Sequence, residues 1–134
     1  MHQKIVIASA LDQGFSDKAI KAANALIAEH GSIVAVHVME PVNNLVQSLV
    51  PEDVKSKAYA SVKNEMMQRF KGLPIEFEIL HGQPGREIAN YAEKINADCI
   101  ILGSHKPGLE DFFLGSTASR VVRYAKCSVY IIRQ

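Results

Sequence analysis

Short apolar runs alternate along the chain with segments whose apolar residues recur every three or four positions. The runs are rich in valine and isoleucine and are bounded by turn residues, which is typical of β-strands. Strands are therefore predicted over residues 4–9, 32–39, 75–80, 97–102 and 128–133. The third run alternates apolar residues with Glu76 and Glu78, so it is expected to be half exposed near an edge of a sheet.

The segments between the runs have helical spacing. A first helix is predicted over residues 16–29, with Gly31 ending it, and a long second helix over residues 51–71. The long helix carries apolar residues at steps of four, which are Val54, Ala58, Val62, Met66 and Phe70. Such a stripe is typical of the buried side of a helix. Two further helices are predicted, one after Pro84 and one ending at Ala125.

Strands that alternate with helices predict βαβ units. The fold class is therefore α/β, with a five-stranded, mainly parallel, twisted sheet and helices on both of its faces. In such folds, ligands bind beyond the carboxyl ends of the strands, at the point where the strand order reverses. A ligand site is therefore expected among the segments that come directly after the strands.

Composition narrows the range of partners. A chain of 134 residues is expected to form one domain, residues 1–134, with a core of its own. Fifteen basic and fourteen acidic side chains leave a net charge of +1, which favours neither nucleic acid nor an anionic membrane as a partner. No apolar stretch has the length of a membrane span or the form of a signal peptide, so a cytoplasmic location is expected. Cys99 and Cys127 lack metal-ligand spacing and are interpreted as buried structural thiols.

The sequence contains none of the common catalytic motifs. A P-loop, a nucleophile elbow, a Gly-x-Gly-x-x-Gly segment after the first strand and a zincin motif are all absent. The five histidines are scattered without paired metal spacing, and His81 and His105 are the two at predicted strand ends, where either could act as an acid or a base. No catalytic residue and no metal site are predicted.

Two glycine-containing segments flank a polar loop late in the chain. Gly103 and Ser104 come after the fourth predicted strand, and Gly115, Ser116 and Thr117 directly precede helical spacing. A helix start leaves backbone N–H groups unpaired, its dipole favours negative charge, and glycine lets a phosphate approach the backbone. The two segments could therefore bind one phosphate-containing ligand. The alternative is local: Ser116 or Thr117 is an N-cap, and the glycines only form turns.

The loop between these segments carries charges of both signs. Lys106 could neutralise a phosphate chain, and His105 lies beside it. Glu110 and Asp111 would repel phosphate unless they point outward or meet it through Mg²⁺. We interpret these two acids as surface residues.

Over essentially its whole length the sequence resembles the universal stress proteins. The resemblance rests on the order of the elements and on two segments, Gly103-Ser-His-Lys-Pro-Gly-Leu-Glu-Asp-Phe-Phe-Leu-Gly-Ser-Thr117 and Val121-Val-Arg-Tyr-Ala-Lys-Cys-Ser-Val129. It is strongest to the F/G type, which has a Ser-His-(Arg/Lys)-Pro loop and a Leu-Gly-Ser helix start. The family implies the universal stress protein fold, a Rossmann-like domain that binds ATP or AMP, is usually dimeric and is produced under stress.

The resemblance also implies site residues. The phosphate- and ribose-binding stretch of the family matches Gly103, Ser104, Gly115, Ser116 and Thr117, with His105 and Lys106 in the loop between them. Val38, at the end of the second strand, is near the position whose backbone meets adenine. The last strand, between Val129 and Arg133, matches the strand that pairs across the dimer.

The sequence departs from the family pattern at two places. Lys106 stands where a glycine is common, in a loop one residue shorter, as in the F/G type. The first strand usually ends in an aspartate that helps to hold the nucleotide, and here Ala10 has that place, with Asp12 two residues later. Either Asp12 substitutes from a reshaped loop, or recognition of the base or ribose is altered.

Two functions from different classes remain open. The first is an adenine-nucleotide-binding stress-response protein that acts as a regulatory or signalling module and a homodimer. Its ligand would be ATP, ADP or AMP, with or without Mg²⁺, and its hydrolysis slow or absent. The second is a protein-interaction stress module that has lost nucleotide binding, as Ala10, Glu110 and Asp111 would suit. A hydrolase that uses His105 or Asp12 is a third, less favoured hypothesis.

Overall fold

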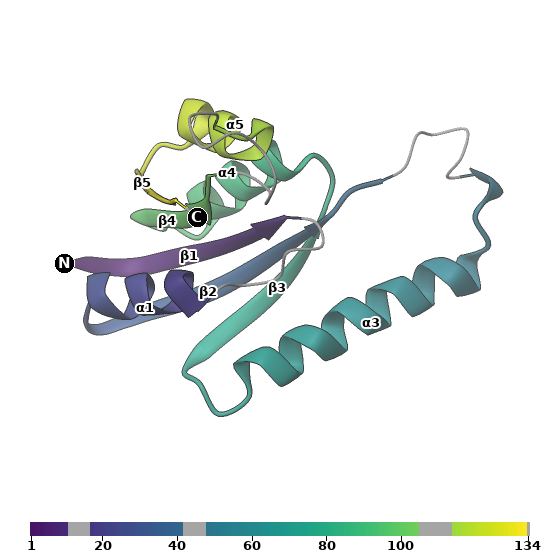
Figure 1. Cartoon of the computed structure of the whole chain (residues 1–134), viewed down its shortest axis with the longest axis horizontal. Coiled ribbons are helices and arrows are strands. Elements are labelled where there is room, and N and C mark those ends of the chain that lie inside the picture. Colours follow the sequence, from purple (N-terminus) through teal and green to yellow (C-terminus); the bar gives the residue numbers. More distant parts are fainter. Residues whose placement is uncertain (11–16, 42–47, 105–113, 134) are drawn as a thin grey trace.

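The structure is a computed structural model that describes residues 1–10, 17–41, 48–104 and 114–133. Its elements succeed one another as strand and helix along the chain (Figure 1). The strands are β1 (His2–Ala10), β2 (Ile27–Met39), β3 (Ile75–His81), β4 (Cys99–Gly103) and β5 (Ser128–Ile132). The helices are α1 (Asp17–Leu26), α3 (Glu52–Phe70), α4 (Pro84–Lys94) and α5 (Ser116–Tyr124). None of the helices within these ranges is long and apolar enough to cross a membrane.

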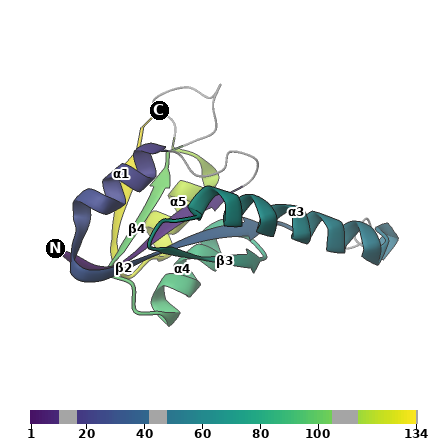
Figure 2. The same ribbon diagram turned by 90° about the horizontal axis from the view of Figure 1, so that it is seen from below.

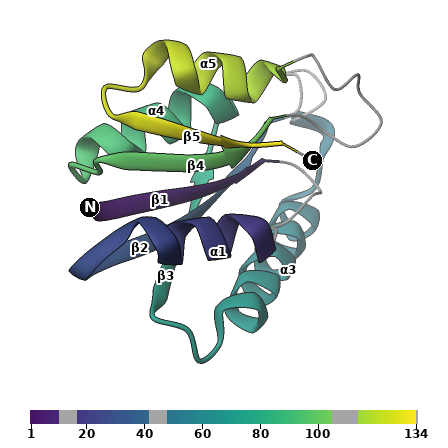
Figure 3. The same ribbon diagram turned by 60° about the vertical axis from the view of Figure 1, so that its left-hand side comes forward.

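The five strands form one parallel sheet in the order β3-β2-β1-β4-β5, with β1 at its centre. Figure 3 shows β5, β4, β1 and β2 one below another, with β3 beyond them. The predicted α/β class and the edge position of the third strand are therefore confirmed. The chain first builds the sheet outward from β1 through β2 to β3, then returns to the other side of β1 with β4 and β5. The strand order therefore reverses between β1 and β4.

Helices cover both faces of the sheet. α1 and α3 lie on one face, which is the near side in Figure 2, and α4 and α5 lie on the other. The first face buries Ile5, Ile7, Ala19, Ala23, Ile33, Ala35, Met66, Phe70, Ile75, Cys99 and Ile101. The second buries Val6, Val34, Val36, Val38, Ile88, Ala92, Ile100, Leu102, Ala118 and Val121. Consecutive residues of β1 and β4 alternate between these two clusters, which is why both strands read as unbroken apolar runs.

The junction of α1 and β2 differs from the sequence prediction. The helix ends at Leu26, and the strand begins at once with Ile27, which pairs with His2. Gly31 was expected to end the helix, but the residue with a left-handed backbone conformation is its neighbour His30, with φ 67°. A Cβ on Gly31 would lie 2.7 Å from Ile27 Cδ1 and 2.9 Å from the Gln3 carbonyl oxygen. The pairing of Ile27 with the start of β1 therefore overrides the helical spacing, and Gly31 allows the chain to pack closely there.

The predicted apolar stripe of α3 is buried only at its carboxyl end. Met66 and Phe70 belong to the core, whereas Val54 is 49% exposed. Figure 2 shows the first half of α3 extending beyond the sheet. Residues of this half have no sheet beneath them, which explains why the stripe is buried at Met66 and Phe70 and exposed at Val54.

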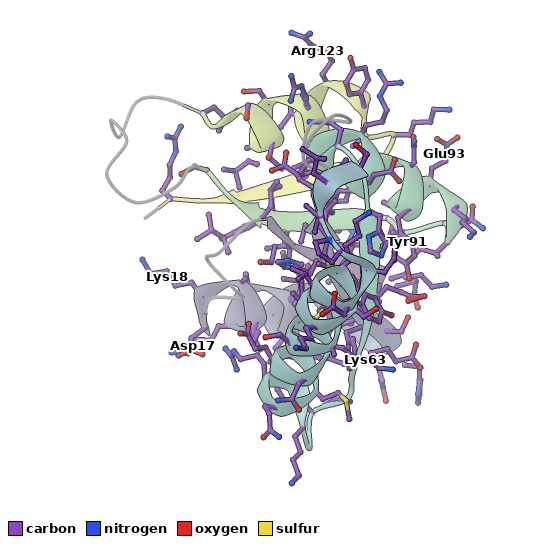
Figure 4. The ribbon with its side chains drawn as sticks, turned by 90° about the vertical axis from the view of Figure 1, so that its right-hand side faces the viewer. Asp17, Lys18, Lys63, Tyr91, Glu93 and Arg123 are labelled. Atoms are coloured by element: carbon purple, nitrogen blue, oxygen red, sulfur yellow. The ribbon has the colours of Figure 1, made fainter. Side chains whose placement is uncertain are left out.

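Two side-chain contacts attach α3 to α1 and to the end of β3. Arg69 Nη2 donates to Asp17 Oδ1 over 2.6 Å, which links the last turn of α3 to the start of α1, where Figure 4 labels Asp17. Further toward the amino end of α3, the Tyr59 ring stacks on the His81 ring with centroids 6.0 Å apart. The helix is thereby attached to α1 and to the end of β3.

Asp98 fastens the amino end of β1 to the start of β4. Its carboxylate accepts hydrogen bonds from the backbone N–H groups of Gln3, at 2.8 Å, and Lys4, at 3.2 Å, and lies 3.5 Å from His2 Nδ1. Burial alone would raise the pKa of Asp98, but the two N–H donors and the charge of His2 outweigh it and lower the pKa below its usual value. The ionised carboxylate is therefore favoured in the folded protein.

We expect Asp98→Asn to cost about 1 kcal/mol of stability at neutral pH, since hydrogen bonds to a charged group are lost at a partly exposed site. A lowered folded-state pKa stabilises the fold above the unfolded value of about 3.9 and loses that effect as the pH falls through the folded value. Urea unfolding at pH 7 and at about pH 3 measures this difference. The gap between wild type and variant should shrink in acid; a gap of constant size would contradict the assignment.

Candidate functional site

The carboxyl ends of β1 and β4 and the first turn of α5 lie on the same side of the molecule (Figure 3). β1 and β4 are neighbours in the sheet, and the strand order reverses between them. Ligands of open α/β sheets bind at this place, because the connections on either side diverge and leave a crevice. The candidate site is therefore built from the residue directly after β4 and from the first turn of α5.

Ser104 connects three elements through its backbone. It comes directly after the last residue of β4, and its N–H donates to the Ile132 carbonyl oxygen at the end of β5, over 2.9 Å. Its own carbonyl oxygen accepts from the Gly115 N–H over 2.6 Å. The two glycine-containing segments that were expected to face one ligand are thus in direct contact.

The Ser104 side chain is itself unusual. It is fully buried, and its hydroxyl has no hydrogen-bond partner among the described residues. Burying an unpaired hydroxyl costs about 1–3 kcal/mol, so most buried hydroxyls in proteins are paired. This one lies where β4 meets the start of α5, which suits a residue kept for a polar ligand.

The start of α5 has no side-chain cap. The N-cap is Gly115, with φ −61° and ψ 161°, and Ser116 and Thr117 are the first two residues of the helix. The alternative in which one of these hydroxyls is the N-cap is therefore wrong. The first turn contains no acidic residue, so no side chain of the turn itself offsets the positive end of the helix dipole.

The backbone angles at Gly115 are ones that any residue adopts. A glycine is therefore not required there for conformation. A glycine at this N-cap would instead allow a ligand to approach the backbone closely, because it has no side chain.

The structure describes only some of the other predicted site residues. Ala10 ends β1 and is paired in register with Val38 of β2, so the backbones of these two residues adjoin. The Val38 side chain is 1% exposed and packs in the α4–α5 core, which leaves its backbone as the group available at this edge. Asp12, His105 and Lys106 lie outside the described residues, as do Glu110 and Asp111.

Sequence reasoning missed the part that α4 contributes. Gln83 caps α4 by accepting from the Arg86 N–H over 2.7 Å, and Gly85, in the first turn, packs against Arg120 and Thr117 of α5. A glycine within helical spacing is a signal that could have been used, because such a glycine usually has a packing reason. The start of α4 therefore adjoins the start of α5.

Ionisable groups with shifted pKa values lie elsewhere in the described structure. Burial raises the pKa of Cys99 to about 11 and raises that of Cys127. Burial, and then the charges of Glu78 and Glu76, raise the pKa of Tyr91, which Figure 4 labels on α4. Cys99 is buried and Cys127 is partly buried, and they pack in the clusters on opposite faces of the sheet. A raised pKa disfavours the reactive thiolate form of each.

The residues that the structure describes contain no group of three or more His, Cys, Asp or Glu side chains able to hold a metal ion. What they offer at the candidate site is backbone N–H groups and hydroxyls. Such groups bind anions and orient them, and are suited to holding phosphate.

Comparison with known proteins identifies the family of this chain. The model of the universal stress protein family matches residues 1–133. Universal stress protein MJ0531 of Methanocaldococcus jannaschii is 38% identical over 88 residues, which are 64% of this chain and 52% of that protein, so the match spans about half of its length. Universal stress protein G of Shigella flexneri is 27% identical over 99% of this chain and 100% of its own.

Solved structures share the fold. The hypothetical protein MJ0577 superposes with a TM-score of 0.83 and 25% identity, covering 100% of this chain and 97% of its own. A universal stress protein from Archaeoglobus fulgidus, solved in complex with dAMP, has a TM-score of 0.60 and 22% identity, with 98% and 97% covered. With the family model matching over nearly its entire length, the chain belongs to the universal stress protein family.

Proposed function

We propose that this protein binds an adenine nucleotide at the carboxyl edge of β1 and β4. The observation that carries the proposal is the contact between Ser104 and Gly115, which brings a buried hydroxyl with no partner among the described residues to the start of α5. Gly103, Ser104, Gly115, Ser116 and Thr117 would hold the phosphates. Two proteins that share the fold were solved with such ligands, one with cAMP and one with dAMP, which supports the choice of an adenine nucleotide.

The phosphates would bind to the first turn of α5. The N–H groups there point out of the helix end, the dipole favours negative charge, and the two hydroxyls can add hydrogen bonds. His105 and Lys106, in the loop before α5, would add positive charge. The phosphate would bring negative charge to a first turn that has no acidic residue of its own.

The base would lie toward β2. The backbone of Val38 would meet the adenine, and Ala10, paired with it in the sheet, would adjoin the ribose. In place of the family's aspartate, Asp12 would hold the sugar. Contacts made mainly by the backbone bind the nucleotide without activating water, so ATP hydrolysis would be slow or absent and the role regulatory or signalling.

Isothermal titration calorimetry with ATP, ADP and AMP, each with and without Mg²⁺, tests the proposal. Binding of any of the three at micromolar to millimolar concentration is the expected result. No heat of binding at millimolar nucleotide, for a protein shown to be folded by circular dichroism, would refute it. Comparing the titrations with and without Mg²⁺ shows whether the ion takes part.

A second candidate is a protein-interaction module without a nucleotide. Ala10 at the end of β1 favours it, because an alanine cannot replace the hydrogen bonds of a carboxylate. Acid extraction of the purified protein, followed by chromatography, separates the two candidates. Nucleotide released in amounts near one per chain argues against the second and for the first.

We also propose that the protein forms a homodimer through β5. This strand is at one edge of the sheet, and none of the described strands pairs with its outer side. The other edge strand, β3, carries exposed Glu76 and Glu78, whose charges disfavour pairing with a second copy. Sedimentation equilibrium measures the mass, and a monomer at 100 µM, a concentration on the order of those used in structural work, would contradict the dimer.

A further inference from the structure

Gly85 lies at a close contact between α4 and α5. It is buried in the first turn of α4, and a Cβ added to it would overlap Arg120 Cβ, well inside van der Waals contact. The same Cβ would lie 3.3 Å from the Thr117 carbonyl oxygen. Arg120 Cβ and the Thr117 carbonyl are both held by the helix of α5, so neither can yield unless α5 moves as a unit.

A second contact ties the two helices further along. The Arg86 guanidinium carbon lies 5.3 Å from the centroid of the Tyr124 ring, over its face, within the range of a cation–π interaction. The first turn of α4 therefore contacts α5 in its first turn, through Gly85 and Thr117, and in its last residue, Tyr124. Two contacts on one helix fix both its distance from α4 and its direction.

Among the described residues, a backbone hydrogen bond and apolar packing also hold the start of α5. Gly115 donates to the Ser104 carbonyl, and Ala118 and Val121 bury the inner side of the helix. A displacement at Gly85 would therefore reach the first turn, where Ser116 and Thr117 would meet the phosphates. A shift of about 1 Å is enough to spoil hydrogen bonds that have to converge on one ligand.

We propose that Gly85 is a positioning residue for the nucleotide site, because the absence of its side chain lets α4 hold the first turn of α5 at its distance from Ser104. The inference rests on the proposed nucleotide binding. Gly85 would not contact the nucleotide itself. Its contact with Arg120 would affect the affinity for the nucleotide through the position of α5.

The test is a set of size exchanges at the two positions. Gly85→Ala should weaken ATP binding about tenfold in calorimetry, because its methyl group displaces α5. Arg120→Gly removes the Cβ that the new methyl group meets, so the double variant with Gly85→Ala and Arg120→Gly should bind within about threefold of wild type. Arg120→Ala removes the same charge and keeps the Cβ, so it should not rescue Gly85→Ala.

Hydrogen exchange of the Gly115 and Ser119 amides, which donate to the Ser104 and Gly115 carbonyl oxygens, gives a second readout without nucleotide. It should be faster in Gly85→Ala and return to the wild-type rate only with Arg120→Gly. If wild type binds ATP and Gly85→Ala binds equally well, or if Arg120→Ala rescues as well as Arg120→Gly, the positioning role is wrong. If wild type binds no nucleotide, the proposed function is wrong, and so is the role of Gly85 in affinity. If the exchange rates of Gly85→Ala equal those of wild type, Gly85 does not position α5.

Discussion

Gly115→Asp should reduce the affinity for ATP about 100-fold while leaving the protein as stable as wild type or slightly more so. Aspartate is among the best N-cap residues, and its backbone readily adopts the angles found at Gly115, so the helix start gains a few tenths of a kcal/mol. The same carboxylate occupies the N–H groups of the first turn and repels phosphate. At a separation of about 4 Å and an effective dielectric constant near 20, like charges oppose one another by about 4 kcal/mol, so even a partly screened contact explains the loss.

Gly115→Asn is the matched control for this prediction. Asparagine has nearly the same size and caps a helix equally well, but it carries no charge. The affinity of the Asp variant should therefore fall well below that of the Asn variant, whereas their melting temperatures should agree. Calorimetry and thermal unfolding provide both numbers. Wild-type affinity in the Asp variant would show that the phosphates do not bind at the start of α5.

Ile7→Ala should destabilise the protein by about 2–5 kcal/mol, the range for truncating a buried isoleucine where the surroundings relax only partly. Ile7 is fully buried on the central strand, pairs in register with Ala35 and Ile101, and belongs to the core between the sheet and the α1–α3 layer. Domains of this kind have about 5–15 kcal/mol of total stability, so this one truncation could remove a large part of it.

Urea unfolding followed by circular dichroism measures the loss, with Val122→Ala as the control. Val122 is 50% exposed on α5, and its truncation should change the stability by less than about 0.5 kcal/mol. Both substitutions shorten a β-branched apolar side chain to alanine, Ile7 at a buried position and Val122 at an exposed one. Equal effects would show that Ile7 is not at the centre of the core.

The elements and the class of the fold could be predicted because the signals are local. A strand covered on both faces has to be apolar throughout, and β1, β2 and β4 are recognisable for that reason. Glu76 and Glu78 alternate with buried or half-buried residues in β3, and this strand does lie at the edge. Boundaries were harder to predict, because Ile27 continues the helical spacing of α1 and yet pairs with His2.

The candidate site could be predicted only in part. The glycine and hydroxyl residues at its two segments are visible in the sequence, whereas the capping role given to Ser116 or Thr117 depended on where α5 begins. The structure places Gly115 at the cap, which frees both hydroxyls from that role. The contribution of α4 was not visible, because nothing in the neighbourhood of Gly85 in the sequence indicates that Arg120 packs against it.

By itself the sequence determined the number and type of the strands, their alternation with helices, and the presence of glycine and hydroxyl residues beyond the fourth strand. These arise from periodicity and residue type, which act over a few neighbouring positions. The tertiary structure alone decided that half of the apolar stripe of α3 extends past the sheet, that the Ser104 hydroxyl is buried without a partner among the described residues, and that α4 meets α5 at Gly85. Each of these depends on close packing between segments distant in the chain, and such packing is set by the whole arrangement of layers and not by any one segment.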